Sequence, residues 1–223
     1  MDVYVEVGAK RVFAGAPAWP GWCRTARDED AALSALLASA TRYADVIGRA
    51  DLRPAFTSPK RSSDLRIVER LAGDSTTDFG APSVAPMVDL SPVKPADLRK
   101  LRAIMQACWE ALDRAARGAA GMELTTGPRG GGRDLGAIVE HVRGAEASYA
   151  GRIAVRLPAG SWSDLSSTAA GRAAMLDGLT RAVAEGVPPT GPRGGVMWTP
   201  RYLVRRAAWH VLDHAWEIED RSS

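Results

Sequence analysis

The chain has 223 residues, enough to bury a sizeable core as one large domain or two modest ones. Its 29 Lys and Arg residues barely outnumber its 26 Asp and Glu residues and form no long basic run, so nucleic-acid binding is not indicated. No apolar run approaches membrane-spanning length, and Cys23 and Cys108 are isolated, with no C-x-x-C pair. We therefore expect a cytoplasmic protein that binds neither nucleic acid nor membranes.

Residues 1–75 predict a small β-β-α-β module. Residues 2–7 alternate polar residues with β-branched or aromatic ones, and a glycine turn leads to a second strand over 11–14, which together indicate a β-hairpin. Residues 28–48 begin with acidic residues, carry an apolar stripe of helical period and end at a glycine, so they predict a helix. Residues 65–71 predict the third strand.

Residues 76–94 are rich in Pro, Ser, Thr and Asp and show no periodicity, so they predict a linker laid over the surface. Beyond this linker, residues 95–223 predict a bundle of four amphipathic helices, at about 95–118, 133–155, 167–185 and 200–219. The connection over 156–166 is long enough to leave the second and third helices parallel, but a bundle with short loops stays open. The overall fold class is α+β.

The histidines are the strongest chemical signal. The chain contains three of them, and His210 and His214 are four residues apart on one predicted helix, so both imidazoles can face a single ion. His141 lies on another predicted helix, and two facing helices could supply three ligands and leave one coordination position open, as in catalytic metal sites. Asp213 and Glu217 follow His210 by three and seven residues and are the candidate catalytic side chains, because a carboxylate there could orient an imidazole N–H. The alternative is that these histidines are ordinary surface or core residues.

A Gly-Pro-Arg-Gly-Gly sequence occurs twice, at 127–131 and 191–195, before each histidine-bearing helix. Glycines let a backbone approach a ligand, and an arginine near a helix N-terminus favours an anion. Arg129 and Arg193, together with Arg206, are therefore candidate contacts for an anionic substrate. The alternative is that both sequences are helix-entry turns with solvated arginines.

Tyr149 and Tyr202 are each eight residues from a candidate ligand histidine, on nearly the same helical face. This spacing makes them candidate substrate-binding side chains that line the same pocket. The alternative for each is a core tyrosine with a satisfied hydroxyl group.

The predicted bundle has one histidine on its second helix and H-x-x-x-H in the last, within Arg206-Ala-Ala-Trp-His-Val-Leu-Asp-His-Ala-Trp-Glu-Ile-Glu219. Over about residues 95–221 this pattern resembles the DinB-like superfamily. The resemblance implies an up-down-down-up bundle and a divalent metal, usually zinc or nickel, held by His141, His210 and His214. It also implies metal-dependent chemistry on low-molecular-weight thiols such as mycothiol or bacillithiol. At the N-terminus, the turn Trp19-Pro20-Gly21-Trp22 and the acidic helix start after it resemble the HicB-like module of antitoxins.

Together these features predict a metal-dependent enzyme that acts on a small molecule. The ion would lower the pKa of a bound thiol or water, giving a transferase of the thiol S-transfer type or a hydrolase. Two alternatives belong to other classes: a non-catalytic binding or stress-response module with a structural metal, and a partner-binding protein that uses its N-terminal module. The sequence leaves a homodimer open.

Overall fold

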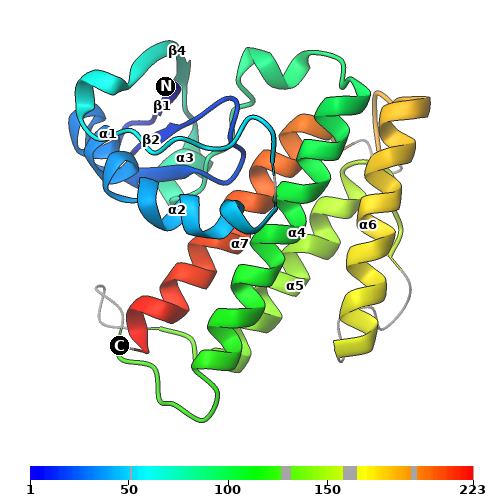
Figure 1. The fold of residues 1–223 in the computed structure, drawn as a ribbon. Helices are drawn as coiled ribbons and strands as arrows, with labels where there is room; N and C mark the ends of the chain where they lie inside the picture. Colours follow the sequence, from blue (N-terminus) through cyan, green and yellow to red (C-terminus); the bar gives the residue numbers. More distant parts are fainter. Residues whose placement is uncertain (51, 127–131, 158–164, 192–194, 223) are drawn as a thin grey trace.

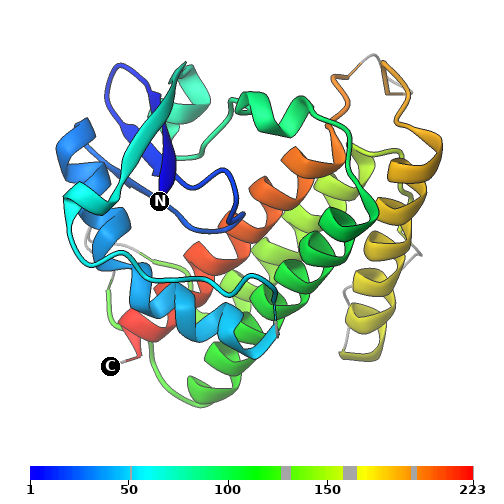
Figure 2. The same cartoon turned by 45° about the horizontal axis from the view of Figure 1, so that its top comes forward.

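The computed structural model is an α+β protein, as the sequence predicts, with seven α-helices and a four-stranded sheet in the part of the chain that it describes. That part comprises residues 1–50, 52–126, 132–157, 165–191 and 195–222, without the side chains of 165–167. The sheet and its short helices lie on one side of the molecule and four long helices lie on the other (Figure 1). Figure 2 shows the same two parts after a turn of 45° about the horizontal axis.

The sheet contains one more strand than the sequence predicts. The predicted hairpin is confirmed, because β1 and β2 pair antiparallel, and the predicted third strand pairs parallel to β1. The order is β3-β2-β1-β4, from β1 (Asp2–Val7), β2 (Val12–Gly15), β3 (Cys23–Ala26) and β4 (Arg66–Ala72). The unpredicted strand β3 has only four residues and no apolar alternation, so its pairing with β2 is what makes it a strand. The prediction of a β-β-α-β module is therefore wrong in this detail.

The helix predicted over 28–48 is two helices, α1 (Glu29–Ala38) and α2 (Ala40–Ile47). Its predicted start is confirmed, because the Asp28 carboxylate accepts a hydrogen bond from the backbone N–H of Ala31 at 2.8 Å. At the break, the Ser39 hydroxyl donates to the Leu36 carbonyl at 2.7 Å, and the Trp22 indole N–H donates to both. These side-chain hydrogen bonds compete with the regular helical ladder, which explains why the helix is interrupted there.

The segment predicted as a linker folds against the sheet. It forms α3 (Ser75–Phe79) and a 3-10 turn at Met87–Leu90. The fully buried carboxylate of Glu6 accepts hydrogen bonds from the Thr77 hydroxyl at 2.5 Å and from the backbone N–H of Ser83 at 2.9 Å. The polar composition that suggested a surface linker therefore supplies the donors for a buried acid.

The four long helices lie where the sequence predicts them, as α4 (Pro95–Gly118), α5 (Leu135–Gly151), α6 (Leu165–Glu185) and α7 (Pro200–Arg221). In Figure 1, α4 and α7 run downward in the view, whereas α5 and α6 run upward. None of the helices in the described residues combines the length and the apolar character needed to cross a membrane.

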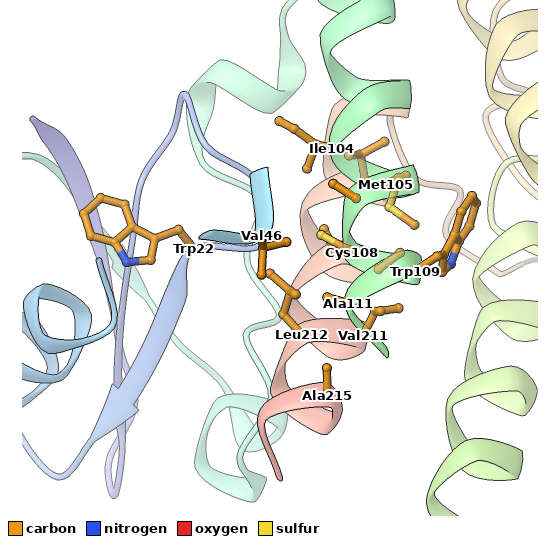
Figure 3. Packing of buried hydrophobic residues seen from close by; sticks show 14 of the residues in the cluster. Trp22, Val46, Ile104, Met105, Cys108, Trp109, Ala111, Val211, Leu212 and Ala215 are labelled. Atoms are coloured by element: carbon orange, nitrogen blue, oxygen red, sulfur yellow. The ribbon is translucent and has the colours of Figure 1, made fainter. Parts of the chain in front are cut away.

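Helix α7 joins the two parts of the molecule. Leu212 packs beside Val211 and Ala215 of the same helix, with α4 on one side and Val46 of α2 on the other (Figure 3). Toward the sheet, the ring of Trp209 meets that of Phe13 edge-on, at 5.8 Å between centroids. Gly21 has a φ of +93°, and a Cβ there would lie only 3.2 Å from α7 side chains, so this turn depends on glycine. Buried apolar residues of the sheet and of the long helices thus form one continuous cluster.

Candidate metal centre

The three histidines meet between α5 and α7, as the spacing of the sequence predicts. Each can offer a ring nitrogen such that the three atoms lie within 4.8 Å of one another. The Nε2 atoms of His141 and His210 are 3.3 Å apart. His210 is 7 % exposed and the His214 side chain 12 %, whereas His141 is half-buried, so water reaches the cluster mainly beside His141.

The spacing of the His141 and His210 nitrogens fits a single metal ion. Two imidazole nitrogens bound tetrahedrally to one ion at about 2.0–2.1 Å must themselves lie about 3.3 Å apart. The ring of His214 is held by a carboxylate, because its Nδ1 is 2.8 Å from Glu217 Oε2. That carboxylate holds the proton on Nδ1 and leaves the Nε2 lone pair available for a metal.

The electrostatics keep two of these imidazoles neutral, which is the form that binds metals. Burial first, and then the neighbouring charges of His214 and Arg206, together lower the pKa of His210 to about 2. Burial followed by the charge of His214 also lowers the pKa of His141. The hydrogen bond with His214 lowers the pKa of Glu217, so this side chain is an anion at neutral pH.

Arg221, which the sequence analysis did not single out, orients Glu217. Arg221 Nη1 donates to Glu217 Oε1 at 2.8 Å, and its Nε donates to the Thr125 carbonyl at the same distance. The series Arg221–Glu217–His214 therefore extends from the loop after α4 to the histidine cluster. The signal was present in the sequence, since Glu217 and Arg221 have the i, i+4 spacing of helical ion pairs.

The second predicted carboxylate is elsewhere. Asp213 forms an ion pair with Arg24 of β3, at 3.1 Å from Nη1, and faces the sheet. Successive residues of a helix are turned by about 100°, so Asp213 points away from the adjacent His214. Of the two candidate catalytic side chains, the structure brings only Glu217 to an imidazole.

Aromatic rings cover one side of the cluster. The ring of Tyr149 meets that of His210 edge-on at 5.7 Å and is itself 5.2 Å from the ring of Trp198, which the sequence analysis missed. Burial raises the pKa of Tyr149. Tyr202 has a different role, because its hydroxyl donates to the Ser83 carbonyl at 2.7 Å and ties α7 to the segment beside the sheet.

Arg206 lies one turn before His210 and forms no ion pair with any residue that the structure describes. Its guanidinium carbon is 5.4 Å from the centre of the Tyr149 ring and 4.7 Å from that of Trp209. Its Nη1 is buried and has no hydrogen-bond partner among the described residues. The other two predicted anion contacts, Arg129 and Arg193, lie outside the residues that the structure describes.

Comparisons of the chain with protein-family models, with curated proteins and with solved structures give no match. The functional conclusion therefore depends on the geometry and chemistry of the histidine cluster.

Proposed function

We propose that this protein is a metal-dependent enzyme of the DinB-like type that acts on a small molecule, most specifically by transferring a low-molecular-weight thiol such as mycothiol. The observation that carries this proposal is the convergence of three imidazoles at ligand spacing, with His214 oriented by Glu217. Zinc or nickel suits three imidazole ligands. The opposed directions of the helix pairs α4, α7 and α5, α6 agree with an up-down-down-up bundle.

In this proposal the ligands are His141, His210 and His214, and a bound ion would supply a lowered pKa for a thiol or water. Glu217 holds the Nδ1 proton of His214 and thereby keeps the ring in one tautomer and one orientation. Arg221 in turn holds Glu217. These two side chains are positioning residues, because neither needs to touch the substrate.

The number of ligands favours catalysis over a purely structural metal. Structural zinc sites are closed by four protein ligands, whereas catalytic sites use three and keep one position for water or substrate. Within the part of the chain that the structure describes, the only His, Cys, Asp and Glu cluster at ligand spacing has three members. A structural role would call for a fourth.

Arg206 gives the site a preference for an anionic substrate. Its guanidinium is held over Tyr149 and Trp209, and its buried Nη1 lacks an acceptor among the described residues. A buried donor without a partner is costly, and a carboxylate of the substrate would satisfy it with a charge-assisted hydrogen bond. Tyr149 would then form the wall between this anion contact and the histidines.

The test is a thiol-transfer assay with the full-length protein loaded with zinc or nickel. Mycothiol, bacillithiol and glutathione are each offered with monochlorobimane, whose thiol adduct is fluorescent. We expect metal-dependent adduct formation with at least one thiol and none with His210→Ala. Equal rates for the loaded wild type, the metal-free protein and His210→Ala with every thiol would contradict thiol transfer.

The variant Arg206→Gln tests the anion contact in the same assay. We expect it to retain its metal and to bind an anionic thiol or electrophile about tenfold or more weakly, since it loses a charged contact. The matched control is Arg24→Gln, because Arg24 pairs with Asp213 on the opposite side of α7. If the metal-loaded protein hydrolyses 4-nitrophenyl acetate and transfers no thiol, the nucleophile is water and not a thiol.

A further inference from the structure

A cavity lies where the sheet part of the molecule meets α4 and α7, on residues that the histidine cluster does not use. It has a volume of about 290 Å³, at the lower end of the range for small-ligand sites. Its apolar walls come from the loop between β2 and β3 and from α4, through Pro17, Pro20, Leu101 and Ile104. A compact apolar body fits such walls.

Two ion pairs line this cavity, and within each pair the positive and negative charges cancel. Arg205 is bound to Asp89 through two hydrogen bonds of 2.6 and 2.7 Å, and Arg201 donates to Asp97 at 2.6 Å. Each aspartate therefore has a specific arginine partner. The pairs add no net charge to the cavity.

Lys100 is the remaining charged residue in the lining. Its ammonium lies 3.6 Å from the centre of the Trp19 ring, and no described carboxylate forms an ion pair with it. The nearby Asp97 is already bound by Arg201. The half-buried position of Lys100 lowers its pKa, because water solvates the ammonium poorly there. The cavity thus combines apolar walls with one positive charge that has no ion-pair partner among the described residues, although Asp97 lies near it.

We propose that this cavity is a binding site for a small organic monocarboxylate, whose carboxylate pairs with Lys100 and whose apolar body lies against Pro17, Pro20 and Leu101. Charge complementarity selects an anion of single charge, and the walls select an apolar body over a hydrated inorganic ion. The ligand would contact both the sheet part and the long helices, so binding stabilises their contact.

The experiment uses the full-length, metal-loaded protein with lysine labelled by ¹³C and ¹⁵N. The chain contains four lysines, so each side-chain ε resonance can be followed separately. Benzoate is titrated as the probe, with benzamide as its neutral match, acetate as the carboxylate without a ring, and inorganic phosphate as an anion without an apolar body. We expect benzoate to move the Lys100 resonance saturably and to raise its pKa, while Lys10 and Lys60 stay unmoved.

Benzamide, acetate and phosphate should each bind at least about tenfold more weakly than benzoate. Lys100→Met keeps the apolar stem and removes the charge, so it should lose the preference for benzoate over benzamide. Lys60→Met, at an exposed lysine elsewhere, should keep it. A Lys100 resonance that does not respond to benzoate, or equal binding of benzoate and benzamide to the wild type, would overturn the proposal. The first readout needs no variant, so it holds even if Lys100→Met fails to fold.

Discussion

Helix α7 carries two buried polar clusters five residues apart, and they differ in how fully their hydrogen bonds are satisfied. At Arg205, the guanidinium binds both oxygens of Asp89 and donates to the carbonyls of Ala16 and Pro17 at 2.9 Å. At His210, Nδ1 is buried without a partner among the described residues, and Nε2 lies 3.3 Å from another imidazole nitrogen. The hydrogen bonds of the first cluster are complete, whereas the second contains a buried nitrogen without a described partner and ring nitrogens at ligand spacing.

The contrast separates structural from functional burial of polar groups. Native proteins satisfy nearly all their buried polar atoms, so a satisfied cluster needs no function to explain it. The Arg205–Asp89 pair fits this case, since it connects α7 to the turn before α4 and to the loop after β2. The histidine cluster differs, because its ring nitrogens converge at ligand spacing and the buried Nδ1 of His210 has no described partner. Breaking each cluster should therefore have different consequences, and the following experiments proceed from the largest expected effect to the smallest.

Removing a ligand histidine should abolish metal binding. We expect about one divalent ion per wild-type chain and none in His141→Ala, His210→Ala or His214→Ala, because two imidazoles are too few to hold the ion. Metal content after equilibrium dialysis, measured by elemental analysis, tests this. Metal content equal to that of the wild type in all three variants would show that the histidines are not the ligands.

Breaking the satisfied cluster should cost stability and leave the metal in place. Asp89→Ala leaves the charge of Arg205 buried and unpaired, and we expect a loss of about 3–5 kcal/mol in the free energy of unfolding. The control is Asp97→Ala, which breaks the partly exposed pair with Arg201 and should cost no more than about 1 kcal/mol. Urea unfolding of the metal-saturated proteins provides the measurement. A loss of metal in Asp89→Ala that still folds would show that the two clusters are coupled.

A third buried group, Glu146 of α5, lies between these extremes. The indole N–H of Trp109 donates to its Oε1, while Oε2 has no partner among the described residues. Burial raises the pKa of Glu146 from 4.5 to about 7. Because the folded pKa is the higher one, the protonated carboxyl stabilises the folded state below about pH 4.5, and this contribution is lost as the pH rises through 7.

Glu146→Gln should remove this dependence on pH. The variant keeps the acceptor for Trp109 and cannot ionise, so between pH 4.5 and 8 the wild type should lose about 3 kcal/mol relative to it. Urea unfolding at a series of pH values measures the difference. A difference between the two proteins that does not change with pH would mean that Glu146 ionises as readily in the folded state as in the unfolded chain.

The carboxylate behind His214 should have a smaller effect than the ligands themselves. Glu217→Gln keeps the size of the side chain but removes the charge that orients the imidazole, and we expect metal affinity to fall by about 10–100-fold. Competition with a chromophoric chelator measures the affinity. Asp213→Asn, whose carboxylate faces Arg24, should leave the affinity unchanged. If the two variants lose affinity equally, the positioning role of Glu217 is refuted.

The smallest effect is expected at the two tyrosines. Tyr202→Phe removes a hydrogen bond to the Ser83 carbonyl and should cost about 1 kcal/mol of stability with no change in substrate binding. Tyr149→Phe keeps the ring against His210 and removes a hydroxyl that has no hydrogen-bond partner among the described residues, so its stability should change by less than about 0.5 kcal/mol. Thermal unfolding of the two variants measures these changes in stability. A larger loss in Tyr149→Phe would give its hydroxyl a structural role.

Local periodicity determined much of this protein in advance. The four long helices begin and end within a few residues of their predicted bounds, because apolar stripes and prolines at the first helical position act within one segment. The i, i+4 spacing placed His210 and His214 on one face for the same reason. The position of His141 on a second helix, with no other histidine in the chain, then left few arrangements for a three-imidazole site.

What lies on each face of a helix was decided only by the tertiary structure. Asp213 and Glu217 have the same predicted role on the basis of the sequence. In the structure, Asp213 faces Arg24 of an unpredicted strand, whereas Glu217 faces His214. The ion pair between Arg205 and Asp89 joins residues 116 positions apart and left no local pattern. A side chain's periodicity depends on the geometry of its own helix, but its partner depends on which distant element covers that face. The sequence therefore indicated the ligands, while the packing of α7 against the sheet and α5 selected the residues that orient them.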